Sequence, residues 1–352
     1  MDLAVLVVNA GSTSLKLHLV DDGETATPVA SLADVDAGGV AAVAHRVVHG
    51  GAHFREPVLL DADVREQIFE LESLAPLHNA PALAAMAEAQ GALPDVPHVA
   101  VFDTAFHATI PDEAAVYALP HRWREDWGIR RYGFHGLSVA WCAERAPDLL
   151  RRAADGLRLV VCHLGGGCSV TALRDGCSVD TTMGFSPLEG VPMTTRSGSV
   201  DPGAVLYLLR ERGLDVGAVD QALNFHSGLA ALSGSSGDMR EIEAAARGGD
   251  ARASLAVDVF VHRVAGSIAA MAAAAGGIDA LVFTAGIGEG SAPVRERVAG
   301  RLRFLGVELD PSQNAEAVPD CDVAARDSPV RVLVIHAREE LVAARAARAL
   351  LD

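Results

Sequence analysis

Three segments of the sequence share one design, in which an apolar run leads into a turn of small residues. The runs cover residues 3–9, 159–163 and 280–284, and the turns that follow contain residues 10–12, 165–167 and 285–290. Short apolar runs that end at glycine are typical of buried strands. A second strand follows each of the first two turns, so the chain holds two hairpins about 150 residues apart. The repeat predicts a duplicated α/β lobe, with one small-residue turn in each copy facing a phosphate.

The first hairpin contains the only lysine of the chain, Lys16, among 29 lysines and arginines. Alternation along residues 14–20 places Lys16 and His18 on the face opposite the leucines, away from the core. A compact ammonium group suits a crowded phosphate loop, whereas a planar guanidinium suits paired oxygens. We therefore expect Lys16 and the turn residue Ser12 to bind an anion. The alternative is that one lysine survives by chance in a chain that prefers arginine.

Length, charge and cysteines narrow the class of protein. A chain of 352 residues is expected to form two domains. Its net charge of −17 argues against nucleic acid and anionic membranes as partners. The five cysteines are odd in number and lack metal or redox spacing, which favours reduced thiols in the cytoplasm. The first residues are expected to form a strand and not a signal peptide.

Apolar spacing and capping residues predict most of the helices. Ser291 is a suitable N-cap and Pro293 fits a first turn. The most apolar helix, residues 255–275, contains Asp258, His262 and Arg263, which favours a buried helix over a membrane span. The expected helices cover residues 64–71, 80–89, 137–154, 202–212, 239–247, 255–275, 291–305 and 338–351.

Three further runs gather charged and aromatic residues: Phe-Asp-Thr-Ala-Phe-His at 102–107, Arg-Tyr-Gly-Phe-His-Gly at 131–136, and Pro-Leu-Glu-Gly at 187–190, which continues to Thr-Arg-Ser-Gly at 195–198. In their order these runs resemble the acetokinase family, within the acetate and sugar kinase, heat-shock and actin fold group. The likeness extends over nearly the whole chain. It implies an α/β fold of two ribonuclease-H-like lobes around a hinged nucleotide cleft. The first lobe would contain residues 1–104 and 338–352, and the second residues 105–337.

The resemblance also implies an activity: reversible, in-line transfer of the γ-phosphoryl group of ATP to acetate, with Mg²⁺ or Mn²⁺ as the metal. It implies a homodimer as well. Two functional alternatives remain. The first is a kinase for propionate or another short acyl acid. The second is a weakly catalytic, nucleotide-binding regulatory protein on the same fold.

Site roles carry over by position in the motifs. Arg46 and Arg196 would clamp the phosphoryl and carboxylate groups, His135 would steady the transition state, and Asp103 would orient the acceptor and an arginine. Asn9 and Glu339 match the metal-associated positions. The acyl pocket is matched by Val48, Leu77, Phe134 and Pro187. The nucleotide positions are matched by Ser12, Lys16, His163, Leu164, Gly165, Gly166, Gly167, Asp238, Met239, Arg240, Gly286, Ile287, Gly288, Glu289 and Gly290.

Each residue also has an alternative reading that needs no ligand. The two arginines could form surface ion pairs, His135 could be a core histidine, Asp103 could cap a turn, and Glu339 could stabilise a helix start. The sequence also departs from the family pattern. Gly166 and Gly290 replace asparagines, and the stretch between residues 20 and 44 is short. Val139 and Ser199 stand where a histidine and an aspartate are usual.

Overall fold

The computed structural model describes residues 3–10, 15–74 and 76–352, and no side chains at 73–78. By contacts the chain divides into two compact units. The first contains Met1–Thr109, Val116–Trp141 and Arg338–Asp352, and the second Ile110–Ala115 and Cys142–Ala337. This division differs from the sequence-based boundary at residue 104, because residues 105–109 and 116–141 group with the first unit. His107 bonds to the carbonyl oxygen of Phe134, and Gly136 lies against the backbone of Asp103, which ties these segments together.

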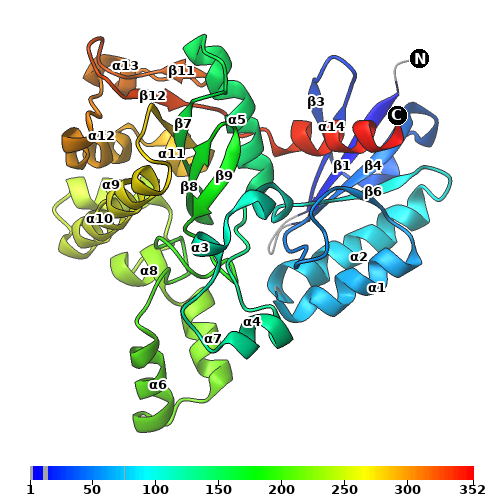
Figure 1. Cartoon of the computed structure of the whole chain (residues 1–352), viewed down its shortest axis with the longest axis horizontal. Helices are drawn as coiled ribbons and strands as arrows, with labels where there is room; N and C mark the ends of the chain where they lie inside the picture. The colour runs from blue at the N-terminus through cyan, green and yellow to red at the C-terminus, as the bar shows by residue number, and fades with distance from the viewer. Residues whose placement is uncertain (1–2, 11–14, 75) are drawn as a thin grey trace. The chain divides into compact units, whose positions relative to one another are not determined.

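The first unit is built on a six-stranded sheet in the order β3-β2-β1-β4-β6-β5 (Figure 1). The strands β1, β4 and β6 are parallel, and β2, β3 and β5 run antiparallel to their neighbours. Their bounds are β1 Ala4–Ala10, β2 Leu15–Val20, β3 Ala26–Val29, β4 Val40–Val47, β5 Val58–Leu59 and β6 His98–Phe102. The carboxyl ends of three parallel strands therefore meet at one edge of the sheet.

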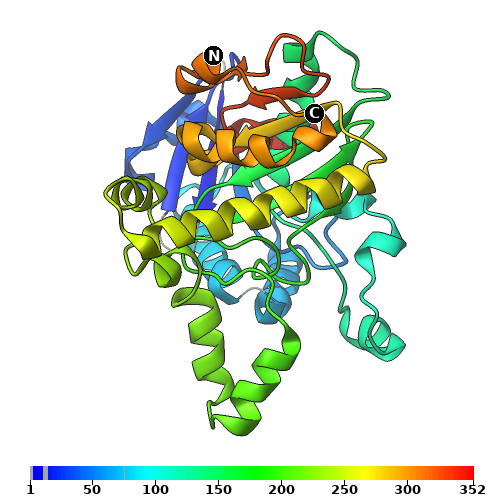
Figure 2. The ribbon, with the colours of Figure 1, turned by 90° about the vertical axis from the view of Figure 1, so that its left-hand side faces the viewer.

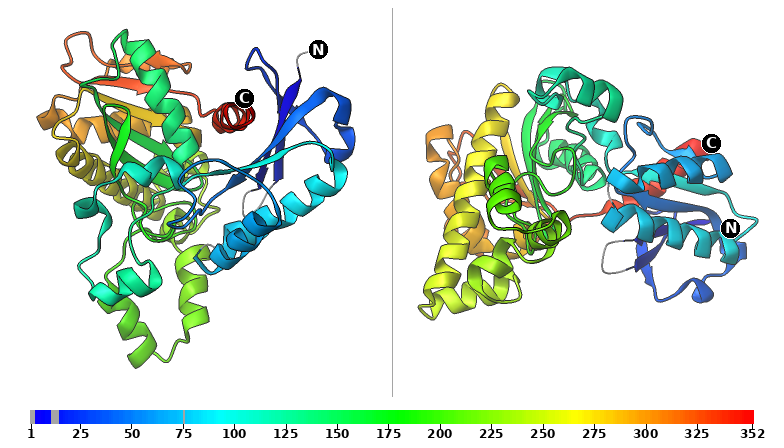
Figure 3. Two further views of the ribbon diagram at one scale, coloured as in Figure 1. Left: turned by 45° about the vertical axis from the view of Figure 1, so that its right-hand side comes forward. Right: turned by 90° about the horizontal axis from the view of Figure 1, so that it is seen from below.

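Helices cover both faces of this sheet. The helices α1 (Ala62–Glu70) and α2 (Pro76–Ala92) close one core, in which Leu6 and Val8 of β1 cluster with Met86 of α2. The C-terminal helix α14 (Glu339–Leu351) packs on β1 and β4 from the other face, and the left view of Figure 3 looks along it beside the strands. The short helix α4 (His121–Trp127) also belongs to this unit.

Because helices cover both faces of the sheet, the burial of side chains on β2 differs from what alternation alone predicts. Leu15 is exposed although it shares a face with Leu17 and Leu19, and Val20 is fully buried on the face of Lys16. The burial of Val20 follows from α14, which packs on β2 and whose Arg348 donates a hydrogen bond to the Val20 carbonyl. Lys16 itself is exposed, as expected from the alternation.

The second unit repeats the topology of the first. Its sheet has the order β11-β12-β10-β7-β8-β9, with β7, β10 and β12 parallel and the other three strands antiparallel to their neighbours. The bounds are β7 Arg158–Leu164, β8 Cys168–Arg174, β9 Cys177–Thr181, β10 Ala280–Thr284, β11 Cys321–Asp322 and β12 Arg331–Val334. In both sheets the short antiparallel edge strand precedes its parallel neighbour in the chain. The duplication predicted from the two hairpins is confirmed.

The helices of the second unit surround this sheet. Figure 2 shows α10 running across the face of the strands, and its contacts with β7, β8 and β9 agree. By length and composition α10 resembles a membrane span, but Phe260, Val264 and Ile268 are buried in the unit, so it is a core helix here. The helices are α3 Asp112–Ala115, α5 Gly136–Leu150 (which begins in the first unit), α6 Pro202–Glu211, α7 Val216–Phe225, α8 Gly228–Ser233, α9 Met239–Arg247, α10 Ala251–Ala274, α11 Ala285–Gly290, α12 Ala292–Arg301 and α13 Pro311–Ala315.

One expected turn is a helix. Residues 285–290, predicted as a glycine turn, form α11, directly after β10. Ala285 takes a positive φ of 64°, which redirects the chain, and its N–H donates to the Glu289 carboxylate. This cap overrides the low helix propensity of three glycines. The next helix begins as predicted, with Ser291 accepting a hydrogen bond from the N–H of Val294.

Candidate active site

Polar side chains line up across the carboxyl ends of the first sheet. Asn9 on β1 pairs laterally with Arg46 on β4 and with Lys16 on β2. Laterally paired residues point to the same face of a sheet, so these three side chains form one row on the face that carries α14. Asp103 follows β6 directly and its N–H donates to the carbonyl of Val47. Three neighbouring strands and the start of a helix thus supply one cluster.

Arg46 is the centre of that cluster. Its Nε donates to Asp103 Oδ1 at 3.0 Å and its Nη2 to Oδ2 at 2.6 Å, a bidentate pair. The side chain of Asp103 is 1% exposed and that of Arg46 14%. The Nε and Nη2 edge of Arg46 therefore grips a protein carboxylate. A bidentate grip on substrate through the same edge would require this pair to open.

The other end of the guanidinium faces Asn9 and Glu339. Arg46 Nη1 lies 3.1 Å from Asn9 Oδ1 and 3.1 Å from Glu339 Oε2. Asn9 Nδ2 donates to the same carboxylate oxygen at 3.4 Å. Glu339 is the first residue of α14, so a helix start delivers this carboxylate to the ends of the strands. We call Asn9, Arg46, Asp103 and Glu339 the Arg46 cluster.

The cluster keeps Arg46 charged despite its burial. Removal from water by itself would lower the pKa of the guanidinium. The nearby carboxylates of Asp103 and Glu339 more than offset this, and the pKa of Arg46 is raised. A permanent cation beside two carboxylates and an amide oxygen suits a site that handles anions and metal ions.

Two members of the cluster offer oxygen atoms to a metal. Within residues 3–10, 15–74 and 76–352, no group of three or more His, Cys, Asp or Glu side chains is placed to hold an ion. Asn9 and Glu339 provide two hard oxygen donors that already converge on one cationic nitrogen. Mg²⁺ is commonly held by one or two protein oxygens, with waters and substrate phosphates completing the shell. The donor set fits Mg²⁺.

The turn at residues 134–136 is fixed against Asp103. A Cβ on Gly136 would lie 2.0 Å from the Asp103 carbonyl oxygen, so only glycine allows this approach. His135 takes a left-handed φ of 61°, a strained conformation that is common at functional sites. The buried His107 donates from Nε2 to the Phe134 carbonyl at 2.9 Å, and burial lowers its pKa to about 4. A neutral imidazole thus holds the turn that presents His135.

The predicted acyl-pocket residues divide between the two units. Val48 and Phe134 are buried in the first, and the ring of His49 meets Phe134 edge-on at 5.3 Å. Pro187 is buried in the second, where its carbonyl accepts from Arg196 Nη1 at 3.4 Å. The side chain of Leu77, like residue Ser12, lies outside the part of the chain that the structure describes.

In the second unit, Arg196 lies close to Cys168, where the loop between β7 and β8 ends. Burial lowers the pKa of its guanidinium, and Cys168 at the start of β8 opposes this shift. The Gly165 N–H donates to the Gly167 carbonyl at 3.0 Å, which closes the loop between β7 and β8. The N–H of Thr194 donates to the Gly166 carbonyl at 3.2 Å and joins the segment of Arg196 to that loop.

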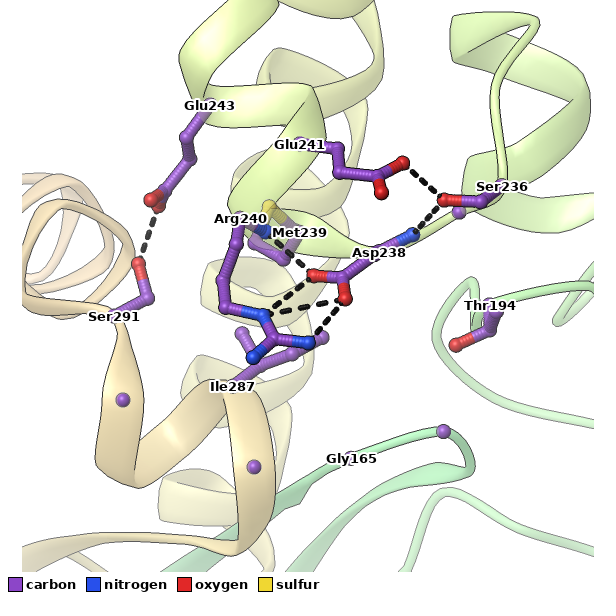
Figure 4. Close-up of a pocket in the computed structure, with 14 residues that line it drawn as sticks. Gly165, Thr194, Ser236, Asp238, Met239, Arg240, Glu241, Glu243, Ile287 and Ser291 are labelled. Atoms are coloured by element: carbon purple, nitrogen blue, oxygen red, sulfur yellow. Dashed lines mark hydrogen bonds and ion pairs between the residues drawn. The ribbon is translucent and has the colours of Figure 1, made fainter.

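A cavity of about 780 Å³ opens beside this loop (Figure 4). Its wall combines the glycine loop, the start of α9 and the helix α11. Of the predicted nucleotide positions, Gly165, Gly166, Asp238, Met239, Arg240, Gly286, Ile287 and Gly290 line it. Six other described positions do not appear in its wall: Lys16, His163, Leu164, Gly167, Gly288 and Glu289. The volume is in the range of small-molecule and cofactor sites.

Part of this wall was not predicted from the sequence, namely Thr194, Ser236, Gly237, Glu241, Glu243 and Ser291. Most of them adjoin predicted positions, so extending each predicted segment by one turn of helix would have found them. Thr194 could be found only by its place two residues before Arg196.

Asp238 and Arg240 form a local pair at the start of α9. The Asp238 carboxylate accepts from the Arg240 N–H at 2.9 Å, which caps the helix, and from the Arg240 side chain (Figure 4). These hydrogen bonds, the one from the side chain foremost, lower the pKa of Asp238 to about 2. The pair places a charged, planar guanidinium in front of Ile287 at the cavity wall.

Comparisons with known proteins all indicate the same family. The family model described as the acetokinase family matches residues 33–345. A curated acetate kinase from Nostoc punctiforme is 48% identical over 92% of this chain and 78% of its own length. A curated acetate kinase from Gloeobacter violaceus is 52% identical over 86% and 75%.

Solved structures agree with the sequence comparison. A propionate kinase from Francisella tularensis has a TM-score of 0.92 at 35% identity, covering 99% of both chains. The acetate kinase of Porphyromonas gingivalis has a TM-score of 0.88 at 32% identity, covering 99% of this chain and 100% of that one. These two structural matches cover both six-stranded sheets. The chain therefore belongs to the acetokinase family.

Proposed function

We propose that this chain catalyses reversible transfer of the γ-phosphoryl group of ATP to acetate, giving acetyl phosphate and ADP. Family membership makes it a kinase, and relatives named acetate kinase align over most of it. The observation that carries the proposal is the Arg46 cluster, which sets a permanent cation and two oxygen donors at the ends of three parallel strands. Phosphoryl transfer asks a protein mainly for positioning and charge neutralisation, which this cluster supplies.

The proposed roles follow from the contacts. Asp103 orients Arg46 through the bidentate pair and leaves the Nη1 end, which lies beside Asn9 and Glu339, to meet substrate oxygens. Acetate is already ionised at neutral pH, so Asp103 need not act as a base for it. His135, on its strained turn, and Arg196 stabilise the charge on the transferring group. Asn9 and Glu339 would hold Mg²⁺, with Mn²⁺ as a second candidate. The bound metal would neutralise phosphate charge.

The nucleotide is assigned to the second unit. Backbone N–H groups of the glycine loop would bind phosphate, and the 780 Å³ cavity between α9 and α11 would hold the nucleoside. Lys16, exposed on the first hairpin, would add a positive charge. Val48, Leu77, Phe134 and Pro187 would enclose the acetate methyl group. In this proposal the two lobes follow the duplicated sheets, and hinged closure brings their residues to one substrate.

A direct test is to incubate the purified chain with ATP, Mg²⁺ and acetate and to trap acyl phosphate with hydroxylamine. We expect acetyl hydroxamate to form in proportion to enzyme and time, and an Arg46→Ala variant to lose orders of magnitude in rate. ATP binding without any hydroxamate would instead support the weakly catalytic alternative, for which the glycines at 166 and 290 are the motivation.

A second candidate substrate is propionate, favoured by the similarity to the Francisella propionate kinase. One additional methylene in an apolar pocket changes kcat/KM by roughly 10- to 200-fold. A series of acetate, propionate and butyrate therefore distinguishes the two. Acetate should give the highest kcat/KM, and a maximum at propionate would reassign the substrate.

The oligomeric state and compartment are part of the proposal. We propose a homodimer, and sedimentation of the purified chain at several concentrations tests it. All five cysteines are free thiols, three of them buried, which supports a reducing, cytoplasmic setting. Fractionation of the cells that express the chain would test that assignment.

A further inference from the structure

Glu289 has a carboxylate with both oxygens engaged. Oε1 accepts hydrogen bonds from the N–H groups of Ala285 and Ala337, each at 2.9 Å. Oε2 lies 2.6 Å from Nδ1 of His336. The Glu289 side chain is 16% exposed and its two contacts with backbone N–H groups are partly buried, whereas the contact with His336 is exposed. One side chain thus ties the first residue of α11 to the segment that follows β12.

The helix α11 has two sides with different tasks. Gly286, Ile287 and Gly290 line the 780 Å³ cavity, whereas Glu289 is absent from its wall. At the far end of α11, the buried Arg295 donates to the carbonyls of Gly288 and Glu289 at 2.9 and 2.7 Å. Both ends of this short helix are therefore held by side chains. A movement of the cavity wall would be transmitted to Glu289 as a rigid displacement.

The segment that Glu289 holds leads straight into the Arg46 cluster. Ala337 is the last residue of the second unit, and Glu339 follows two residues later as the first residue of α14. The neighbouring N–H of His336 donates to Asp320 Oδ1 at 2.8 Å, and Asp320 Oδ2 accepts from Arg145 of α5. Within the first unit, the guanidinium of Arg338 lies 5.5 Å from the ring of Trp141 on the same helix α5.

We propose that Glu289 is a positioning residue that links the nucleotide cavity to Glu339 and does not itself contact the nucleotide. The inference rests on the proposed roles of the Arg46 cluster. The Glu289 bond to the Ala337 N–H fixes the backbone from which Glu339 enters that cluster. In this proposal, nucleotide bound against α11 influences Glu339 through the chain segment that joins them. A misplacement of about 1 Å at such a group costs on the order of a hundredfold in rate.

The test compares Glu289→Ala with Glu289→Gln. The alanine variant loses all three contacts. The glutamine variant keeps an oxygen that accepts from the two N–H groups, and its amide can donate to His336. We expect Glu289→Ala to lower kcat by about 10- to 100-fold while the dissociation constant for MgADP, measured by calorimetry, changes by less than about threefold. Glu289→Gln should restore kcat to within about threefold of the starting chain. The matched control is Glu296→Ala, an exposed glutamate on α12 that should change neither quantity.

Hydrogen exchange gives a readout that does not depend on activity. The Ala337 amide should lose protection in Glu289→Ala and keep it in Glu289→Gln. Weaker MgADP binding with kcat intact in Glu289→Ala would overturn the proposal and make Glu289 a nucleotide contact. If the alanine variant fails to fold, loss of Ala337 protection in Glu289→Gln with full kcat would also overturn it.

A separate variant distinguishes a failure of this inference from a failure of the proposed function on which it rests. Glu339→Gln removes the charge of the proposed metal ligand and should reduce kcat whatever Glu289 does. A fully active Glu339→Gln chain would refute the metal role of Glu339, and the positioning claim with it. An inactive Glu339→Gln with a fully active Glu289→Ala would refute the positioning claim alone.

Discussion

Arg46 is held by three side chains that lie far from it in the sequence. Asp103 is 57 residues away and Glu339 lies near the C-terminus, yet both carboxylates reach one guanidinium. Sequence motifs identified each of these residues and an arginine partner for Asp103, but not which arginine or the contacts of Asn9 and Glu339, because the pairing depends on how β1, β4, β6 and α14 assemble. Arg46 makes its bidentate pair with the protein's own Asp103. The proposed clamp on substrate stays a prediction.

The Arg46–Asp103 pair should contribute to stability as well as to catalysis. Removing one partner of a buried ion pair leaves the other charge unpaired, which typically costs about 3–5 kcal/mol. We expect Asp103→Ala to lower the free energy of unfolding in urea by that amount and to reduce kcat strongly. Asp63→Ala, on the exposed first turn of α1, is the control. Equal urea midpoints for Asp103→Ala and Asp63→Ala would show that the Arg46–Asp103 pair does not stabilise the fold.

Gly136 is a second residue whose role is fixed by packing. An added methyl group would meet the Asp103 carbonyl at 2.0 Å, so Gly136→Ala must displace the turn that carries His135. Overpacking of this kind costs about 1–3 kcal/mol or more. Gly39→Ala, where nothing lies within 4 Å of the added carbon, should be tolerated. Thermal unfolding and kcat of both variants check this, and a fully active, equally stable Gly136→Ala would contradict the assignment.

The elements that could be predicted from sequence are those with a clear period or cap. The central strands β1, β2, β7, β8 and β10 are apolar or alternating runs, and the helix α9 has the expected bounds of Met239–Arg247. The edge strands β5 and β11 have two residues each, too few to show any period. The helix α11 was missed because its glycine-rich sequence favours a turn, and its stability comes from the tertiary contacts of Glu289 and Arg295.

Two histidines inside the first sheet should make its stability depend on pH. His45 on β4 and His98 on β6 are hydrogen-bonded at 2.8 Å, and burial, then the neighbouring His98, lowers the pKa of His45 to about 3. Burial also lowers the pKa of His98. Both rings are neutral when folded, but the unfolded chain binds protons below about pH 6.5. Stability should therefore fall as pH drops from about 6.5 toward 4.

Urea unfolding at pH 7, 6, 5 and 4.5 measures this slope. Each such histidine contributes up to about 1.4 kcal/mol per pH unit below its unfolded pKa. His45→Gln should reduce the dependence of the unfolding free energy on pH by the contribution of about one histidine. His121→Gln, on an exposed side chain, should leave this dependence unchanged. Identical slopes for the starting chain and His45→Gln would mean that His45 does not titrate on unfolding.

At the scale of the whole molecule, the chain repeats one sheet topology and gives each copy a different task. The first copy holds the Arg46 cluster at the ends of β1, β4 and β6, and the second holds a glycine loop and a large cavity. Sequence patterns were sufficient to predict this duplication. They did not predict that residues 116–141 group with the first unit. This grouping depends on individual contacts such as the hydrogen bond between His107 and the Phe134 carbonyl.

The central claim is that an oxygen of acetate attacks the γ-phosphorus of ATP directly. The most direct measurement uses ATP that is chiral by isotopic labelling at the γ-phosphorus and determines the configuration of the phosphoryl group in the acetyl phosphate formed. A single direct transfer predicts inversion of configuration at phosphorus. Retention, which requires two displacements, or no acetyl phosphate at all from a folded and nucleotide-binding chain, would contradict the claim.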